Sequence, residues 1–214
     1  MPDQTLRQSP LERFGLRARQ AATPHAAAIR CWEQAFLGHI NLRGDTGDPQ
    51  FASAIASVLG AELPTTPNTT SGGQGITIYW LGPDEWLIVT PGEREREIAT
   101  ELRTALGPIF SAVTELGGGQ TVVELRGAAV RELLAKACPL DFHPRSFPVG
   151  TCAQSRLAKA PVLLRPLDDD GAFEIVIRRS YADYFWLWLE EAAAEHGLCV
   201  SPEAIAPRPS QEPA

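Results

Sequence analysis

The stretch His39-Ile40-Asn41-Leu42-Arg43-Gly44 alternates polar and apolar side chains, a pattern typical of a half-buried β-strand that stops at a glycine. Asp48-Pro49 follows, and this pair is typical of a helix N-cap with proline at the first helical position. The next apolar residues form one helical stripe, which comprises Phe51, Ile55, Val58 and Leu59. The segment therefore predicts a strand, a turn and an amphipathic helix that ends at Gly60.

The rest of the first half continues this pattern of short elements separated by glycine and proline. The elements predicted downstream are a surface loop over 64–75, a hairpin of strands 76–81 and 86–90, a helix over 93–106 and a strand over 109–113. The order strand, helix, strand, strand, helix, strand is that of the ferredoxin-like fold. In that fold two helices cover one face of an antiparallel sheet.

A second copy of this order follows, and Leu125-Arg126-Gly127 in it repeats Leu42-Arg43-Gly44 at the end of a strand and shortly before a helix. The elements predicted for this copy are a strand at 120–125, a helix at 128–136, strands at 151–157, 161–164 and 173–177, a helix at 180–196 with Ser180 and Asp183 as a capping box, and a strand at 198–200. We therefore expect an α+β fold of duplicated ferredoxin-like βαββαβ halves, with pseudo-repeats at about 36–115 and 118–200 that share one core.

Both ends of the chain are rich in proline and charge. We expect residues 1–25 to be a flexible segment, residues 26–200 to form the domain and residues 201–214 to be a flexible tail. Charges are spread through the first twenty residues, which argues against a signal peptide. The sequence also lacks a run of about 18 apolar residues, so it predicts no membrane span.

Composition narrows the choice of partners and compartment. The formal net charge of −7 argues against nucleic acid as a partner, because phosphate binding needs clustered Lys and Arg. The four cysteines, Cys31, Cys138, Cys152 and Cys199, are widely spaced and include no Cys-x-x-Cys pair. This spacing predicts reduced thiols in a cytoplasmic protein rather than a disulfide framework.

The stretch at 138–150, Cys-Pro-Leu-Asp-Phe-His-Pro-Arg-Ser-Phe-Pro-Val-Gly, cannot be a helix because its three prolines remove backbone donors. Leu140, Phe142 and Phe147 give it more apolar surface than a solvated linker has, and Asp141, His143 and Arg145 are interleaved with them. We expect an ordered loop that packs either on its own domain or on another chain.

The last predicted helix places apolar or aromatic side chains around nearly its whole circumference, namely Tyr181, Tyr184, Phe185, Trp186, Leu187, Trp188 and Leu189. A helix on the surface of a monomer needs only one apolar stripe. The helix is therefore expected either to lie between the two halves or to be covered by another subunit. Taken with the proline-rich loop, this pattern gives a candidate partner interface of Phe142, His143, Arg145, Phe147, Arg179, Tyr181, Phe185 and Trp186.

The sequence contains few residue patterns that indicate catalysis or cofactor binding. The sequence has no Gly-x-Gly-x-x-Gly, no P-loop and no Gly-x-Ser-x-Gly elbow, and its histidines lack the spacing of a helical metal pair. We therefore predict no catalytic, cofactor-binding or metal-binding residue in this chain. Asp84 and Glu85 are adjacent carboxylates in the hairpin turn, and they are either solvated turn residues or acceptors for a pteridine ring or a partner backbone.

Several blocks, taken together and in order, resemble the sarcosine oxidase gamma subunit family over residues 36–200. The blocks are Leu37-Gly38-His39, Leu42-Arg43-Gly44-Asp45, Asp48-Pro49, Leu81-Gly82-Pro83-Asp84-Glu85-Trp86-Leu87, Gly118-Gly119-Gln120-Thr121, His143-Pro144, Phe147-Pro148-Val149-Gly150, Val176-Ile177-Arg178-Arg179-Ser180, Ala182-Asp183-Tyr184, Trp186-Leu187-Trp188-Leu189 and Gly197-Leu198. Their shared order is far more specific than any one block.

The resemblance implies a fold like the folate-binding domain of the glycine-cleavage aminomethyltransferase, and alpha, beta and delta subunits as partners. Such a heterotetramer oxidises the N-methyl group of sarcosine and forms glycine, hydrogen peroxide and formaldehyde or 5,10-methylenetetrahydrofolate. The resemblance also implies that FAD, FMN, NAD, zinc and tetrahydrofolate are held by the other subunits. This chain is then expected to be a non-catalytic subunit that stabilises the assembly of an oxidoreductase.

Two alternatives stay open at this point. The first is a free-standing, folate-binding aminomethyltransferase-like protein that uses Asp84 or Glu85 to hold the pteridine, although the chain is short for a complete enzyme of that kind. The second is a scaffold for a different amine-oxidising complex.

Overall fold

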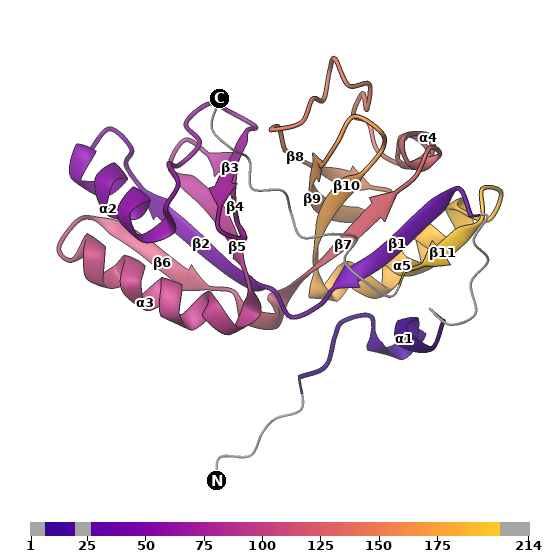
Figure 1. Ribbon diagram of the computed structural model, residues 1–214, viewed down its shortest axis with the longest axis horizontal. Coiled ribbons are helices and arrows are strands. Elements are labelled where there is room, and N and C mark those ends of the chain that lie inside the picture. Colours follow the sequence, from indigo (N-terminus) through magenta and orange to yellow (C-terminus); the bar gives the residue numbers. More distant parts are fainter. Residues whose placement is uncertain (1–6, 20–26, 202–214) are drawn as a thin grey trace, which may run out of the picture.

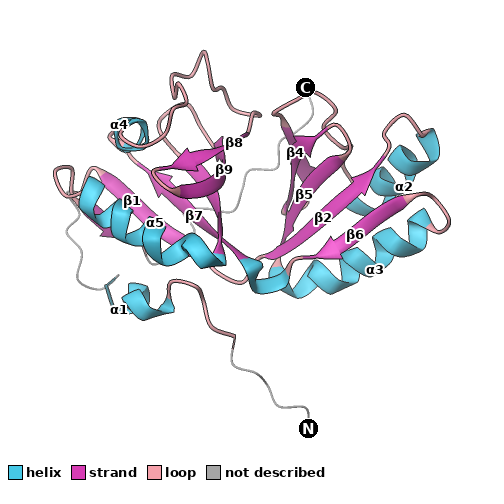
Figure 2. Cartoon of the chain, turned by 180° about the vertical axis from the view of Figure 1, so that it is seen from behind, coloured by secondary structure: helices cyan, strands magenta, loops and turns pink. Residues whose placement is uncertain are grey.

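The computed structural model describes residues 7–19 and 27–201. Two sheets meet along one edge of the molecule and diverge from there, and the main helices lie on their outer faces (Figure 1). Viewed from behind, α2 and α3 cover the outside of one sheet and α5 covers the outside of the other (Figure 2). The inner faces of the two sheets therefore face each other.

The first half has the predicted order of elements with one additional strand, β3. Its elements are β2 (Gly38–Gly44), α2 (Pro49–Leu59), β3 (Thr70–Gly73), β4 (Ile76–Gly82), β5 (Glu85–Thr90), η3 (Gly92–Arg94), α3 (Glu95–Leu106) and β6 (Ser111–Glu115). They form a five-stranded sheet in the order β3-β4-β5-β2-β6. Without the edge strand β3, this is the strand order of a ferredoxin-like half.

The second half repeats the arrangement with one insertion. Its elements are η4 (Gly117–Gly119), β7 (Gln120–Arg126), α4 (Val130–Ala135), β8 (Ala153–Leu157), β9 (Ala160–Pro166), β10 (Phe173–Arg178), α5 (Arg179–Ala192) and β11 (Leu198–Val200). The sheet order is β11-β1-β7-β10-β9-β8, so β1 (Ile29–Gln34) from the start of the chain lies between the first and last strands of this half. The predicted duplication is confirmed, and β8 is the counterpart of β3.

Local signals account for the element ends that were predicted correctly. The Asp48 side chain accepts a hydrogen bond from the Gln50 backbone nitrogen at 2.8 Å, and Gly60 ends α2 with φ 64°. The repeated glycines Gly44 and Gly127 are required by close contacts. A Cβ on Gly44 would lie 2.2 Å from the Phe51 ring, and one on Gly127 would lie 2.0 Å from the Ala28 carbonyl oxygen.

Five details of the prediction are wrong. The strand β1 was not expected, and β3 lies within the predicted surface loop at 64–75. The last helix begins at Arg179, so Ser180 lies inside it and no side chain caps it, and the Asp183 carboxylate pairs with Arg13 at 3.0 Å. That helix ends at Ala192 rather than at residue 196.

The N-terminal segment is the fifth correction, because part of the expected flexible segment 1–25 packs on the domain. Residues 9–19 include η1 (Glu12–Phe14) and α1 (Leu16–Arg19), and Leu11 and Leu16 belong to the core of the second half. The Ser9 hydroxyl donates to the Glu33 carboxylate on β1. Residues 1–6 and 20–25 of the same expectation, and the tail at 202–214, lie outside the described residues.

Three apolar clusters hold the molecule together. One lies under α2 and α3 in the first half, one lies under α4 and α5 in the second half, and the third lies between the sheets. The third cluster consists of Tyr79, Leu87, Val89, Val122, Cys152, Leu163 and Val176. A backbone bridge also joins the halves, since the Thr70 nitrogen donates to the Gly150 oxygen and the Cys152 nitrogen to the Asn68 oxygen, both at 2.8 Å.

Candidate partner-binding surface

The proline-rich loop at 138–150 packs its two phenylalanines on its own domain. Phe142 and Phe147 are buried, and their rings lie 5.6 and 6.4 Å from the ring of Phe173 on β10. The Arg131 side chain donates to the Phe142 carbonyl oxygen at 3.0 Å. The first of the two expectations for this loop is therefore correct for these side chains, and Phe142 and Phe147 do not belong to an exposed interface.

The tip of the same loop is polar and exposed. The Asp141 carboxylate accepts hydrogen bonds from the His143 backbone nitrogen at 2.9 Å and from the Ser146 hydroxyl at 2.6 Å. These two hydrogen bonds, the Ser146 bond foremost, lower the pKa of Asp141. The turn presents the exposed residues His143 and Arg145 to solvent.

The helix α5 buries one side completely within this chain. Phe185 and Trp186 have no exposed surface, so they are corrected from interface candidates to core residues. The Phe14 ring lies 5.9 Å from the Trp186 ring, and the Arg19 guanidinium lies 5.7 Å from it. The N-terminal segment thus covers part of the surface that the sequence assigned either to the other half or to another subunit.

The other side of α5 remains exposed. Tyr181, Tyr184 and Leu187 are 36%, 36% and 52% exposed, and Arg179 is exposed at the start of the helix while it donates to the Gln8 carbonyl oxygen at 3.1 Å. The 138–150 loop and α5 lie at opposite edges of the second half (Figure 1). The candidate residues that remain exposed therefore form two separate surfaces: His143 and Arg145 on one, Arg179 and Tyr181 on the other.

Ionisable groups on the inner faces are engaged in structural pairs. Glu174 is fully buried and accepts from Arg165 at 2.9 Å and from the Tyr79 hydroxyl, so this contact links the two sheets. Glu124 accepts from Arg126 and Gln34, both at 2.7 Å. Burial raises the pKa of Glu124 above its ordinary value, and the hydrogen bond from Arg126 opposes that shift.

The two carboxylates of the hairpin turn have different surroundings. Glu85 accepts a hydrogen bond from Asn41 at 2.8 Å and from Arg43 at 2.6 Å. Both of its carboxylate oxygens are therefore bonded to side chains of the neighbouring strand β2. Asp84 is exposed at the tip of the turn. Of the two candidate folate contacts, Asp84 is the more exposed residue.

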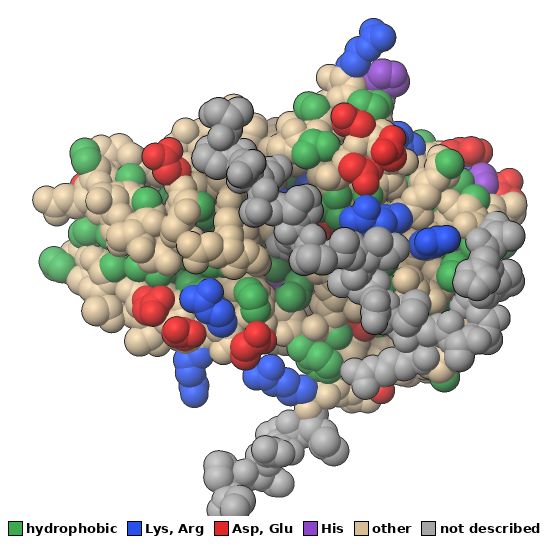
Figure 3. Space-filling view, viewed as in Figure 1, with side chains coloured by type: hydrophobic (Ala, Val, Ile, Leu, Met, Phe, Trp, Pro, Cys, Tyr) green, Lys and Arg blue, Asp and Glu red, His purple; other side chains and the backbone are tan. Residues whose placement is uncertain are grey.

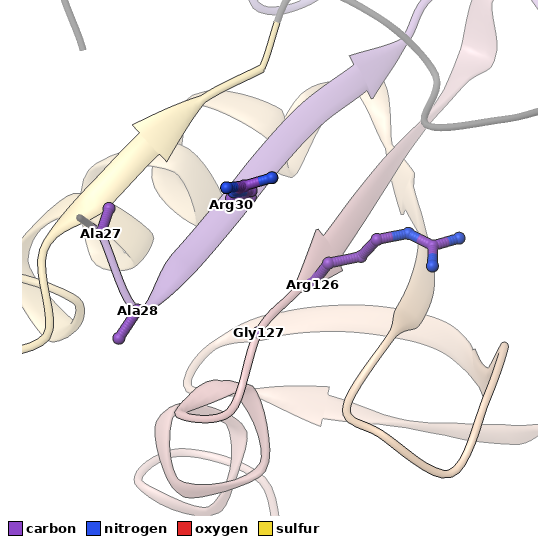
Figure 4. Close-up of a pocket in the computed structure, with 5 residues that line it drawn as sticks. All are labelled: Ala27, Ala28, Arg30, Arg126 and Gly127. Atoms are coloured by element: carbon purple, nitrogen blue, oxygen red, sulfur yellow. The ribbon is translucent and has the colours of Figure 1, made fainter. Parts of the chain in front are cut away.

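A pocket of about 300 Å³ lies where β1 begins and β7 ends. Ala27, Ala28, Arg30, Arg126 and Gly127 line it, and Figure 4 shows both arginines on neighbouring strands. Arg126 is held by Glu124 and, at 3.3 Å, by Asp168. Arg30 is exposed, so the pocket offers one guanidinium to an anionic group.

One exposed aromatic was not singled out from the sequence. Phe110, in the turn between α3 and β6, is 98% exposed, which is the highest value among the large apolar side chains in the described ranges. Hydrophobicity alone does not identify it, because the adjacent apolar residue Ile109 is partly buried in the core of the first half. A charge-free sequence around the turn is the signal that could have identified it.

Within residues 7–19 and 27–201, no group of three or more His, Cys, Asp or Glu side chains is arranged to hold a metal ion. Across the same ranges, none of the helices combines the length and apolar content that a bilayer crossing needs.

A duplicated α+β chain whose buried charges pair with one another, and whose exposed surface includes several large apolar side chains, has the features of a partner-binding scaffold. The family model described as sarcosine oxidase, gamma subunit family matches residues 43–195. The chain belongs to the sarcosine oxidase gamma subunit family.

Individual relatives agree with this family. The chain is 34% identical over 192 residues to sarcosine oxidase subunit gamma of Corynebacterium sp. strain P-1, which covers 89% of this chain and 92% of the relative. It is also 34% identical to the subunit gamma of an Arthrobacter species, with the same coverage of both chains.

Solved structures agree with the fold. A chain of the heterotetrameric sarcosine oxidase from Corynebacterium sp. U-96 superimposes with a TM-score of 0.79 and 30% identity, covering 95% of this chain and 100% of that one. The aminomethyltransferase T of the glycine cleavage system from Bartonella henselae gives a TM-score of 0.59 at 13% identity, over 87% of this chain and 50% of that one. The second match confirms the expected likeness to that fold and says nothing of function.

Proposed function

We propose that this chain is the gamma subunit of a heterotetrameric sarcosine oxidase and that it is a structural, non-catalytic member of the complex. The observation that carries the proposal is the match along nearly the whole chain to a subunit of such an oxidase, in sequence and in fold. The engagement of Glu174, Arg165 and Glu124 in pairs within the fold supports a structural role.

The proposed partners are the alpha, beta and delta subunits. In this proposal they hold FAD, FMN, NAD, zinc and tetrahydrofolate, and they convert sarcosine to glycine, hydrogen peroxide and formaldehyde or 5,10-methylenetetrahydrofolate. The packed side chains between the two sheets, among them Tyr79, Val122 and Leu163, support the assignment of these cofactors to other chains. A large cofactor on these inner faces would have to displace that cluster.

The contact surfaces proposed for these partners are the two exposed groups described above. Tyr181 lies on the exposed side of α5 with Tyr184 and Leu187, where aromatic side chains can supply apolar contact area. His143 and Arg145 on the loop tip, and Arg179 at the start of α5, would supply polar contacts at the rim. A cytoplasmic location is part of the proposal, and the four free cysteines, three of them buried, support it.

Co-production with the other three subunits tests the function. With a tag on this chain, we expect the other subunits to co-purify and the preparation to form hydrogen peroxide from sarcosine. Leaving this chain out should lower the yield of assembled oxidase, whereas activity per assembled flavin should change little in any complex that still forms. The proposal fails if the other subunits assemble to the same yield, and with the same thermal stability, without this chain.

Tetrahydrofolate binding by the isolated chain is the second proposal, favoured by the exposed carboxylate of Asp84 at the hairpin tip. Titration calorimetry would detect micromolar binding that Asp84→Ala abolishes. Asp45→Ala is the matched control, because Asp45 is also an exposed carboxylate in a turn. Binding that is absent, or equal in the wild type and Asp84→Ala, would exclude a folate site at this turn.

A further inference from the structure

The turn between α3 and β6 carries a large apolar side chain, that of Phe110, which is not packed against the rest of the chain. Gly107 ends α3, its nitrogen donates to the Arg103 oxygen at 3.1 Å, and the Ile109 nitrogen donates to the Leu106 oxygen at 2.9 Å. The Ser111 hydroxyl bonds the Ile109 oxygen at 2.9 Å. These bonds fix a short turn in which Ile109 packs inward while Phe110 is left 98% exposed.

The duplicated half provides an internal comparison. The equivalent turn joins α5 to β11 and carries Glu195, His196 and Gly197, with no large exposed apolar side chain among them. Glu195 there pairs with Lys136, so that turn is polar and tied to its own half. The fold therefore does not require an aromatic side chain at this place.

The surroundings of Phe110 have the character of an interface core. Residues 104–114 contain no charged side chain, although 21% of the whole chain is charged. The charges that flank this stretch in the sequence, Arg103 and Glu115, pair with each other at 2.9 Å, and Arg43, opposite Ala112 on the neighbouring strand, pairs with Glu85 at 2.6 Å. Depletion of charge around an aromatic residue is the compositional mark of an interface core. Figure 3 shows hydrophobic and uncharged surface at the end of the molecule that holds this turn.

We propose that Phe110 is an anchor that inserts into an apolar pocket on another subunit of the oxidase. This inference rests on the proposed function, because the matching solved chain is part of a heterotetramer. A second copy of this chain is a less suitable occupant, since each copy has a formal net charge of −7 and the neutral turn offers no attraction to offset the repulsion. An aromatic ring on a rigid turn loses little conformational freedom when it enters a pocket.

The test uses the co-produced complex with a tag on this chain. Because Phe110 contacts almost nothing in its own fold, substitutions there should leave the melting temperature of the isolated chain unchanged. In the complex, Phe110→Asp is expected to weaken retention of the other subunits at least about tenfold, Phe110→Ala should lie between it and the wild type, and Phe110→Leu should remain close to the wild type. Thr65→Asp, an exposed position in the α2–β3 connection, adds the same charge elsewhere and should have no effect.

Each outcome decides one question. If wild-type chain retains the other subunits and Phe110→Asp retains them equally, the anchor is overturned and the proposed function stands. If wild-type chain retains none of them, the proposed function itself fails. A wild-type chain that sediments as a dimer, with Phe110→Asp a monomer, would assign the turn to self-association and overturn the partner-subunit pocket.

Discussion

His39 lies on β2, is buried at 1% exposure and has a pKa well below its ordinary value. Burial lowers its pKa from 6.5 to about 4, whereas the backbone of Leu37 and the negative charge of Glu174 oppose the shift. The imidazole is therefore neutral in the folded protein at neutral pH. As the pH falls, the unfolded chain binds a proton at His39 at a higher pH than the folded chain does.

This difference gives stability a specific pH dependence. Between pH 6.5 and about 4 the unfolded state binds more protons at His39 than the folded state does. The contribution of neutral His39 to the free energy of unfolding is therefore complete above pH 6.5 and is lost as the pH falls toward 4. The loss amounts to about 3 kcal/mol. Urea denaturation across this range should show a steeper decline for the wild type than for His39→Leu. Parallel pH profiles for the two proteins would contradict the assignment.

A second prediction concerns the contribution of the buried Arg165–Glu174 ion pair to stability. Glu174 is fully buried, so Arg165→Met leaves a buried carboxylate without its cation and should lower the free energy of unfolding by about 3–5 kcal/mol. Adding Glu174→Gln to Arg165→Met should recover part of this loss, because the unpaired charge is removed. The control is Asp183→Asn in the exposed Arg13–Asp183 pair, where the expected change is at most about 1 kcal/mol. Equal effects at the buried and exposed pairs would refute the argument.

The first helix of the second half is shorter than that of the first half, and the N-terminal segment supplies core residues in its place. In the first half α2 has 11 residues and packs beside α3, whereas α4 has only 6 residues. The core of the second half is completed instead by Leu11 and Leu16 from the N-terminal segment and by Phe142 and Phe147 from the proline-rich loop. Both segments therefore act as structural parts of the second half.

Leu11 tests this compensation, because its side chain has no exposed surface. Leu11→Ala should lower the free energy of unfolding by about 2–5 kcal/mol, as expected for a truncated core leucine. Glu12→Ala, at the adjacent exposed position, should change it by less than about 0.5 kcal/mol. Chemical denaturation of the two variants makes the comparison, and similar stabilities would show that the N-terminal segment adds nothing to the core.

These elements also show what the sequence could and could not predict. Strands such as β2 and helices such as α2 were predictable because alternation, caps and glycines act locally. The strand β1 was missed, since the adjacent buried residues Cys31 and Trp32 break a simple polar–apolar alternation and its main partner, β7, lies about ninety residues away along the chain. The full apolar circumference of α5 was noticed, but the meeting of Trp186 with Phe14 depends on a contact that no local pattern encodes.

Chain connectivity ties the two halves more closely than a simple duplication would. The strand β1 precedes the first half in sequence but pairs with β7 and β11 in the second sheet. The buried Tyr79–Glu174 hydrogen bond and the shared apolar cluster join the inner faces. A division of the chain between the pseudo-repeats therefore separates the second sheet from one of its internal strands.

Splitting the chain at the β6–β7 junction tests this dependence. A fragment of residues 117–214 lacks β1 and the N-terminal segment, so its β7 and β11 lose their shared neighbour and its core loses Leu11 and Leu16. We expect this fragment to be insoluble or unfolded alone, and to fold when it is co-produced with residues 1–116. A matched fragment of residues 35–116, without β1, should fail to rescue it, because it lacks the strand that fills the gap. Circular dichroism and co-purification measure both results, and cooperative unfolding of residues 117–214 alone would show that the second half is independent.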